Sequence, residues 1–292
     1  MKTDDIRIAV IGGSGLYAMD GLEILEERWI DTPFGKPSDA VIIGTLNGVK
    51  IAFLPRHGRG HVHSPPSIPV RANVWALKSL GVFWVISVAA CGSLKEEIPP
   101  RDFVIPDQII DRTKSRVNSL FEGLTAHVNF ASPFHADLRA ILLDAAGELE
   151  HIRTHDGGTY VCMEGPLFST KAESELYRSW GASLIGMTAI PEAKLFREAE
   201  MCYASICLAT DYDCWRETEH VDINEIMNNV AFNTQNVQEL IKRAVPKIPL
   251  GKESDCDASQ ALVGAIMTRP DLISDEAWEA NKLFIAHRVT RA

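Results

Sequence analysis

Short apolar runs alternate with longer amphipathic stretches along most of the chain. Residues 6–11, 82–90, 159–163 and 203–209 are almost continuously apolar and end near glycines or polar residues, which is typical of buried strands. Apolar residues at helical spacing predict helices over residues 69–80, 135–149, 171–180, 191–200 and 221–244, the last interrupted near Phe232 and Asn233. The alternation predicts an α/β fold with a mixed central β-sheet flanked by helices in a single domain.

A hairpin is predicted near the N-terminus, because Asn47-Gly48 lies between the apolar runs 41–44 and 49–54. The first strand runs into Gly12-Gly13-Ser14-Gly15, and with Ala18 this loop nominally fits a dinucleotide-binding glycine pattern. An early antiparallel hairpin argues against a nicotinamide-dependent oxidoreductase, because that fold needs a crossover helix and a second parallel strand. The loop is better explained as a phosphate cradle of backbone N–H groups and the Ser14 hydroxyl.

Composition excludes several classes of function. The 292 residues carry a net charge of −10, so a basic surface of the kind that nucleic acids need is not expected. The longest apolar runs are too short to cross a bilayer, and the acidic N-terminus lacks the apolar segment of a signal peptide. The six cysteines lack the spacing of metal sites or disulfide frameworks. We expect a cytoplasmic protein with no metal and no membrane or nucleic-acid partner.

The most informative stretch is Thr210-Asp-Tyr-Asp-Cys-Trp215, directly after the apolar run 203–209. Asp211 and Asp213 lie two residues apart, which places both carboxylates on one side of an extended chain. Burial and a like charge raise a carboxyl pKa, so one of them, for which Asp211 is our candidate, can hold a proton near neutrality. Such a pair can donate to a ring nitrogen and accept from an exocyclic amine, as a 6-aminopurine requires. On the hexapeptide alone, an acidic loop with Asp213 capping a turn is an equally good interpretation.

Other predicted strand ends carry groups suited to an anion. Arg56 and His57 follow the second hairpin strand, and arginine geometry allows a bidentate clamp on an oxyanion. A solvated basic turn is the alternative interpretation. Thr188, after a further strand, adds a hydroxyl donor.

Apolar groups suited to a sugar and a base accompany these polar ones. Met187 and Phe168 offer soft and aromatic surfaces, and Ile223 and Ile226 can close an apolar pocket. Phosphate, sugar and purine together indicate phosphorolysis of a nucleoside.

Eight short motifs lie in order along residues 6–247. They are Ile11-Gly-Gly-Ser-Gly15, Asp31-Thr-Pro-Phe-Gly-Lys-Pro-Ser-Asp39, Arg56-His-Gly58, Ala72-Asn73-x-Trp75-Ala76, Ala90-Cys-Gly-Ser-Leu94, Glu164-Gly-Pro166, Met187-Thr188 and Thr210-Asp-Tyr-Asp-Cys-Trp215. Each motif is weak alone, but their order is specific. Together they resemble the purine nucleoside phosphorylase superfamily and, within it, the 5′-methylthioadenosine phosphorylases.

The resemblance implies a role for each matching position. The implied phosphate contacts are Ser14, Arg56, His57, Ala89, Ala90 and Thr188. The implied nucleoside contacts are Phe168, Ser169, Met187, Asp211, Tyr212, Asp213, Ile223, Ile226 and His127, the last lent by a neighbouring subunit. Asp211 and Asp213 are the implied catalytic pair, facing N7 and the 6-amino group. A homotrimer is implied, with inorganic phosphate as co-substrate and no cofactor.

The implied reaction is phosphorolysis of 5′-methylthioadenosine to adenine and 5-methylthioribose 1-phosphate, with 5′-deoxyadenosine and adenosine as secondary substrates. The alternative within the superfamily is a 6-oxopurine nucleoside or methylthioinosine phosphorylase. Alternatives from other classes are a nicotinamide oxidoreductase and a non-catalytic purine-binding protein.

Three positions depart from the family pattern. Ala89 replaces a common Thr, Leu167 a common Arg and Gly186 a common Asn, which affects the detail of the pocket rather than the reaction class. The expected domain organisation is a nucleoside phosphorylase domain over residues 1–249 and a C-terminal helical extension, residues 250–292, packed on the same domain. Helices are predicted in this extension over residues 257–267 and 275–287.

Overall fold

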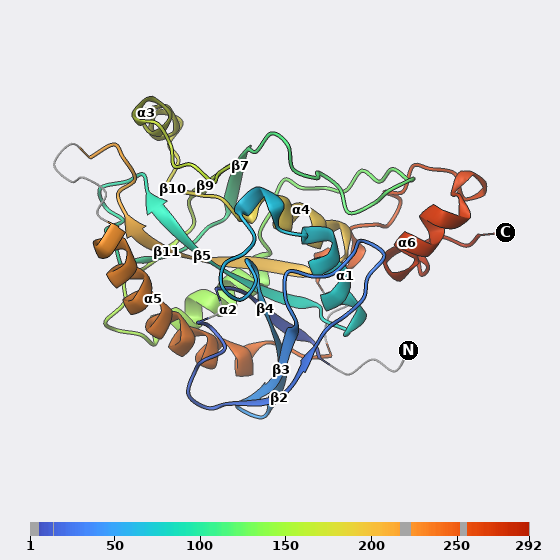
Figure 1. The fold of residues 1–292 in the computed structure, drawn as a ribbon, viewed down its shortest axis with the longest axis horizontal. Helices are drawn as coiled ribbons and strands as arrows, with labels where there is room; N and C mark the ends of the chain where they lie inside the picture. The colour runs from blue at the N-terminus through green and yellow to red at the C-terminus, as the bar shows by residue number, and fades with distance from the viewer. Residues whose placement is uncertain (1–5, 14, 217–222, 252–255, 292) are drawn as a thin grey trace.

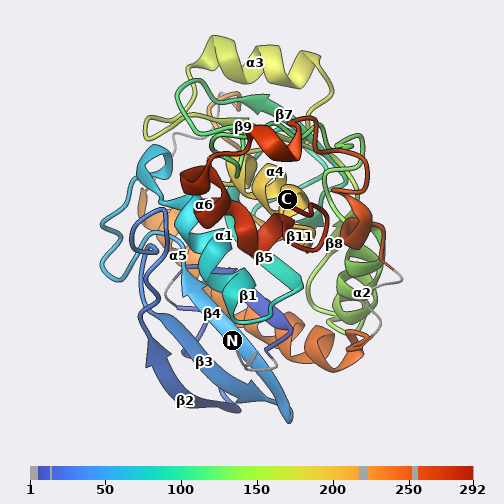
Figure 2. The same ribbon diagram turned by 90° about the vertical axis from the view of Figure 1, so that its right-hand side faces the viewer.

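The computed structural model describes residues 6–13, 15–216, 223–251 and 256–291. They form an 11-stranded mixed sheet with helices on both faces, which confirms the predicted fold class (Figure 1, Figure 2). The strands are β1 (Ile8–Gly12), β2 (Leu22–Arg28), β3 (Val41–Leu46), β4 (Val49–Pro55), β5 (Trp84–Ser93), β6 (Phe103–Ile105), β7 (Gln108–Arg112), β8 (Thr154–Asp156), β9 (Thr159–Met163), β10 (Leu184–Gly186) and β11 (Cys202–Asp211). The helices are α1 (Val70–Ser79), α2 (Ala136–Gly147), α3 (Lys171–Ser179), α4 (Ala189–Glu198), α5 (Ile223–Ala244) and α6 (Asp275–Ile285).

The sheet branches at its central strand, β5. One path runs β2-β3-β4-β1-β5-β10-β9-β7, while β11 pairs with the other side of β5 and continues to β6 and β8. β1 is parallel to β5 and pairs with it as far as Ser87, whereas the antiparallel β10 pairs only with Gly92 and Ser93. β11 follows β5 from Trp84 to Gly92. Among the described strands, residues 88–91 of β5 therefore have a neighbour on one side only, and we call this stretch the sheet break.

Helices cover both faces of the sheet because successive side chains of the central strands point in opposite directions. Ile8 and Val10 of β1 pack in one apolar cluster with α2 and α5. Ala9 and Ile11 pack in the other cluster with α1, α4 and α6. Figure 2 shows α1, α4 and α6 grouped on the same side of the molecule. This packing places the loops that follow β4, β5, β10 and β11 around the sheet break.

Most predicted elements are present, with small differences at their ends. The Asn47-Gly48 hairpin is confirmed, since β3 and β4 are antiparallel and both turn residues have positive φ, 50° and 78°. Thr170 caps α3 in a capping box with Glu173. Two strands were not predicted: β2, which lies at the sheet edge with mostly exposed side chains, and β8, which has three residues.

Two helix predictions were wrong. α5 runs without interruption over 22 residues, because Asn233 is fully buried and donates a hydrogen bond to the Ala209 carbonyl of β11. In the predicted helix over residues 257–267, only Asp257–Gln260 is helical, and it forms a 3-10 turn. Ala126 in the preceding long irregular segment forms a β-bridge with Ile266 in this region.

The last described segment packs on the rest of the chain. Ile273, Phe284 and Ile285 belong to the apolar cluster that also contains Ala9 and Ile11 of β1. Asn281 of α6 is buried and donates to the Glu122 carbonyl at 2.8 Å. Of the helices that the structure describes, none combines the length and apolar character needed to cross a bilayer.

Candidate active site

Arg56 lies inside the protein rather than on the surface of a pocket. It follows β4, and its side chain and that of Glu192 in α4 are each 3% exposed. Two nitrogens of Arg56 donate to the Glu192 carboxylate: Nε to Oε1 at 2.5 Å and Nη2 to Oε2 at 3.1 Å. Two further bonds reach β5, from Nη1 to the Val88 carbonyl at 2.8 Å and from Nη2 to the Ser87 hydroxyl at 2.7 Å. The charge and hydrogen bonds of Glu192 outweigh the effect of burial and raise the pKa of Arg56.

These bonds change the expected role of Arg56. Within the described part of the chain, one Nη1 proton of the guanidinium has no partner. One N–H can reach an anion, instead of the two that the predicted bidentate clamp needs. Arg56 also ties β4, β5 and α4 together beside the sheet break. Sequence reasoning missed Glu192, because an acid in the first turn of a helix is ordinary.

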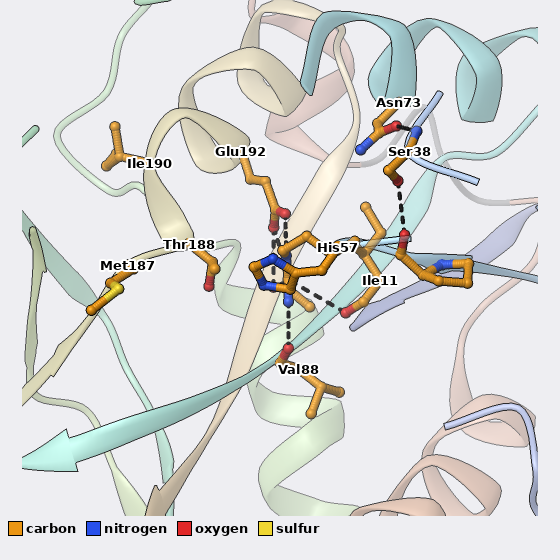
Figure 3. A network of polar contacts seen from close by, with 12 residues as sticks. Ile11, Ser38, His57, Asn73, Val88, Met187, Thr188, Ile190 and Glu192 are labelled. Atoms are coloured by element: carbon orange, nitrogen blue, oxygen red, sulfur yellow. Dashed lines mark hydrogen bonds and ion pairs between the residues drawn. The ribbon is translucent and has the colours of Figure 1, made fainter. Parts of the chain in front are cut away.

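His57 and Thr188 lie beside this network (Figure 3). His57 Nδ1 lies 2.8 Å from the His63 carbonyl, which only accepts, so Nδ1 carries the hydrogen and Nε2 is left for a ligand. Its ring stacks on His61 with centroids 4.1 Å apart. Burial lowers the pKa of His57 to about 4, and the nearby Arg56 charge acts in the same direction. Among the described residues, the Thr188 hydroxyl has no hydrogen-bond partner, so it too is available to a ligand.

The sheet break itself offers backbone donors. Ala89 is buried, whereas Ala90 is exposed although it lies in the central strand. In a strand, the backbone N–H and C=O groups of residues i and i+2 point toward the same neighbouring strand position. The Val88 carbonyl points toward Arg56, so the Ala90 N–H points to that side as well. The predicted phosphate contacts His57, Ala90 and Thr188 thus lie at or beside the sheet break. Ser14 lies outside the described residues.

The two aspartates lie at the end of β11, opposite Gly92 of β5. Asp211 Oδ1 accepts the Asp213 backbone N–H and Oδ2 accepts the Thr210 hydroxyl, both at 2.7 Å. Asp213 has a φ of 52°, so a turn replaces the extended geometry expected from the sequence. A β-carbon at Gly92 would lie 3.1 Å from Asp211 Oδ1 and 3.3 Å from Asp213 Cβ, which shows how closely both residues approach β5.

Burial is the main cause that raises the pKa of Asp213, and the charge of Asp211 adds to it. The sequence-based hypothesis gave the retained proton to Asp211. Asp213 is 8% exposed, and its raised pKa supports a proton on its own carboxyl, while the proton on Asp211 stays a prediction.

Two buried asparagines of α5 hold the last residues of β11. Asn229 donates to the Thr210 carbonyl at 2.8 Å and Asn233 to the Ala209 carbonyl at 2.9 Å. Arg101 Nε donates in turn to Asn229 Oδ1 at 2.8 Å. Sequence reasoning missed both asparagines. The available signal was an amide at a position that helical spacing places on the buried face.

Tyr160 explains one of the unusual positions in the sequence. A β-carbon at Gly186 would lie 2.1 Å from Tyr160 Oη and 2.7 Å from Cζ, so the tyrosine occupies the space that a side chain at 186 would need. The ring is fully buried, and the Thr188 backbone N–H lies 3.5 Å from its hydroxyl. Gly186 and Tyr160 are therefore a matched pair that supports the Met187-Thr188 turn.

The predicted base and sugar contacts differ widely in exposure. Phe168 is 71% exposed and Leu167 is 83% exposed, in the loop between β9 and α3. Ser169 Oγ donates to the Met163 sulfur at 3.4 Å. Met187 is half-buried and packs against residues of the cluster around Val161. Phe168 is thus free to stack on a planar ligand.

Three further predicted contacts lie around α5 and β11. Ile226 is half-buried on α5, and Ile223 begins that helix. Tyr212 is 8% exposed, and its ring packs edge-on against Trp215 with centroids 5.6 Å apart. The Tyr212 side chain therefore supports the loop from inside the protein.

His127 lies elsewhere in this chain. It is exposed in the long irregular segment, and its backbone N–H donates to the Ala265 carbonyl at 2.9 Å. It borders a surface cavity of about 380 Å³ together with Arg197 and Asp257. The structure does not bring it to the other predicted site residues of the same chain.

Comparisons with known proteins identify the family. Residues 7–246 match the Phosphorylase superfamily. The S-methyl-5′-thioadenosine phosphorylase of Geobacter sulfurreducens is 50% identical over 285 residues, which cover 97% of this chain and 99% of that protein. The enzyme of the same name from Synechocystis sp. is 49% identical and is covered to 86%, with 95% of this chain aligned.

Solved structures that resemble this chain belong to the same family. A crystal structure of methylthioadenosine phosphorylase from an antarctic soil metagenomic library has a TM-score of 0.91 and 44% identity, covering 97% of this chain and 99% of that one. Methylthioadenosine phosphorylase from Schistosoma mansoni, in complex with adenine, has a TM-score of 0.84 and 33% identity, covering 90% and 99%. The chain therefore belongs to the Phosphorylase superfamily and, within it, to the S-methyl-5′-thioadenosine phosphorylase family.

Proposed function

We propose that this protein catalyses phosphorolysis of 5′-methylthioadenosine to adenine and 5-methylthioribose 1-phosphate. The observation that carries the proposal is the set of groups around the sheet break. Asp211 and Asp213 lie at one end, against Gly92, while His57 and the Arg56 network lie at the other, near Val88. Four strand residues span about 13 Å. This distance suits a nucleoside whose base lies at the aspartates and whose anomeric carbon lies above a phosphate.

In the proposed mechanism, the aspartate pair supplies a proton to the leaving base. Adenine departs poorly as an anion, so a proton at N7 lets the glycosidic electrons move into the ring. The raised pKa of Asp213 supports a proton on the pair, and the carboxylate that remains accepts from the 6-amino group. General acid help of this kind contributes about 10²–10⁴-fold to the rate.

Phosphate acts as both stabiliser and nucleophile. We propose that hydrogen phosphate lies between the His57 ring, the Ala90 amide and the Thr188 hydroxyl. Its P–OH group donates to Nε2 of His57, and Ser14 and one N–H of Arg56 complete its contacts. Its negative charge stabilises the cationic sugar as the bond to the base lengthens, and one oxygen then bonds to the anomeric carbon. No cofactor takes part in these steps.

Product analysis tests the proposal. Incubation with 5′-methylthioadenosine should release adenine and 5-methylthioribose 1-phosphate only when phosphate is present. Adenine release at the same rate without phosphate would identify a hydrolase, and the absence of any release would refute the proposal. Arg56→Ala should raise KM for phosphate more than KM for the nucleoside.

The nucleobase is tested by comparing 5′-methylthioadenosine with methylthioinosine. A carboxylate pair suits a 6-amino group, whereas a 6-oxo group needs a donor, commonly an amide. Faster turnover of methylthioinosine would favour the 6-oxopurine alternative. Ile223, Ile226 and Met187 favour a methylthio group over a hydroxyl by about 1–3 kcal/mol, so 5′-deoxyadenosine and adenosine are proposed as slower substrates.

Assembly and domain organisation are part of the proposal. The exposed Phe168 and the remote His127 support a homotrimer in which His127 enters the 5′ pocket of a neighbour. We further propose a cytoplasmic enzyme with one phosphorylase domain, residues 1–249, and a helical extension, residues 250–292, of that domain. Light scattering coupled to gel filtration tests the trimer, and a monomer with full activity would refute the shared pocket.

A further inference from the structure

A cluster of soft ligands lies at the opposite end of β11 from the aspartates. His135 is the N-cap of α2, Cys202 begins β11, and Cys256 is the N-cap of the 3-10 turn Asp257–Gln260. The three side chains are 5%, 0% and 3% exposed, and their ligand atoms all lie within 4.8 Å of one another. Ten strand residues, about 30 Å, separate this cluster from the candidate active site.

Two groups converge on one ring nitrogen in this cluster. His135 Nε2 lies 3.0 Å from Cys256 Sγ and 2.6 Å from Asp257 Oδ1. A ring nitrogen offers either one hydrogen or one lone pair, so it cannot make a full bond with both. A cation at the centre of the cluster would serve the imidazole and both sulfurs at once, with the Asp257 carboxylate beside the imidazole.

We propose that His135, Cys202, Cys256 and Asp257 form a structural zinc site. Two thiolates, one imidazole and one carboxylate are zinc ligands, and four of them match the tetrahedral coordination of closed sites. Tetrahedral bonds of about 2.0–2.3 Å separate ligand atoms by about 3.3–3.8 Å, so the two short contacts of His135 Nε2 need to widen by about 1 Å. Asp257 is 74% exposed and lies outside the three residues whose ligand atoms are within 4.8 Å of one another, so its carboxylate has to turn inward to become the fourth ligand.

Charge also fits zinc. Two thiolates and a carboxylate carry three negative charges, one more than Zn²⁺ neutralises. Arg197 can balance the remaining charge, because its Nη1 lies 3.9 Å from Asp257 Oδ2. A surface cavity is bordered by Arg197 and Asp257, so the Asp257 carboxylate lies on the solvent side of the cluster, while the Trp84 and His135 rings pack edge to face. The site would join the segment after residue 256 to α2 and β11.

Spacing along the chain does not indicate this site. Its ligands come from positions 135, 202 and 256–257, far from any compact ligand spacing. The expectation that the cysteines form no metal site rested on that spacing, and the tertiary structure brings together residues that the spacing separates.

Zinc content of untagged protein tests the site. After purification with a reductant and without a chelator, mass spectrometry of metals should find about one zinc per chain that survives dialysis. Cys256→Ser and Cys202→Ser should lose it, whereas the matched control Cys162→Ser, also fully buried but outside the cluster, should keep it. Equal zinc in Cys256→Ser and the unmodified protein would overturn the proposal.

A second measurement needs no variant. Metal-free wild-type protein titrated with Co²⁺ should develop a thiolate-to-cobalt charge-transfer band, which Zn²⁺ then abolishes. No band and no zinc uptake by reduced protein would overturn the proposal. An intact mass lower by two hydrogens would instead identify a Cys202–Cys256 disulfide, which would also overturn it. Neither measurement depends on phosphorolysis.

Discussion

Removing the charge of Glu192 should destabilise the fold strongly while changing hardly any volume. Glu192→Gln is nearly isosteric, but the carboxylate accepts from two nitrogens of Arg56, from the Tyr203 hydroxyl at 3.0 Å and from the Ser87 hydroxyl at 3.2 Å. The amide nitrogen of Gln would face at least one of these donors in either orientation. The variant would also leave the Arg56 cation buried without a counter-charge.

The expected cost follows from the burial of the pair. Both side chains are 3% exposed, so solvent screens their interaction little. Removing one partner of a buried ion pair costs about 3–5 kcal/mol, because the other charge stays desolvated. For a chain of this size the melting temperature should fall by about 6–15 °C.

Thermal unfolding followed by circular dichroism measures this effect. Glu175→Gln, an exposed acid on α3, is the matched control and should change nothing. The double variant Arg56→Met with Glu192→Met should recover part of the loss, because two apolar side chains replace two buried charges. A loss below about 1 kcal/mol in Glu192→Gln would refute the reasoning, since it would mean that the pair is solvated or that Arg56 finds another anion.

The remaining predictions concern the proposed reaction and its supports. Asp211→Asn and Asp213→Asn should each lower kcat on 5′-methylthioadenosine by about 10²–10⁴-fold, since an amide cannot supply the proton; near wild-type kcat in either would remove that residue from the acid role. Because burial lowers the pKa of His57 to about 4, the unfolded chain binds this proton first as the pH falls below 6.5. His57 therefore contributes stability that is fully present above pH 6.5 and is lost as the pH falls from 6.5 to about 4. In chemical denaturation, the free energy of unfolding of His57→Asn should depend less on pH over this range than that of the unmodified protein. Gly186→Ala should cost about 1–3 kcal/mol by collision with Tyr160, and the same change in a Tyr160→Phe background should cost less, because the closest atom is gone. Equal costs in both backgrounds would show that the ring moves aside freely.

Several features of the site were predictable because they depend on local sequence. Apolar runs predicted the buried strands, and polar residues directly after them marked where ligand groups would lie. Asn47-Gly48 predicted its hairpin because φ above zero is cheap for these two residues. The Asp211–Asp213 pair was recognisable as a candidate because buried carboxylates need partners, and the accompanying motifs favoured a site over an acidic turn.

Other features depend on pairs of residues that no local pattern connects. Glu192 meets Arg56 across 136 positions, and this contact changes an expected anion clamp into an internal ion pair. Asn233 looked like an interruption of a helix, yet its amide reaches the Ala209 carbonyl. The turn at Asp213 replaced an extended geometry, because the backbone N–H of Asp213 bonds to Asp211.

The sequence by itself therefore determined the class of fold, the order of most strands and helices, and the residues that gather at strand ends. The tertiary structure decided which of those residues lie at the sheet break and which are buried in the core. The reason is the sheet break, which exists because β1 leaves β5 at Ser87 and β10 joins only at Gly92. That pairing is set by packing between distant strands, and it leaves Ala90 exposed in a strand whose residues all look buried in sequence.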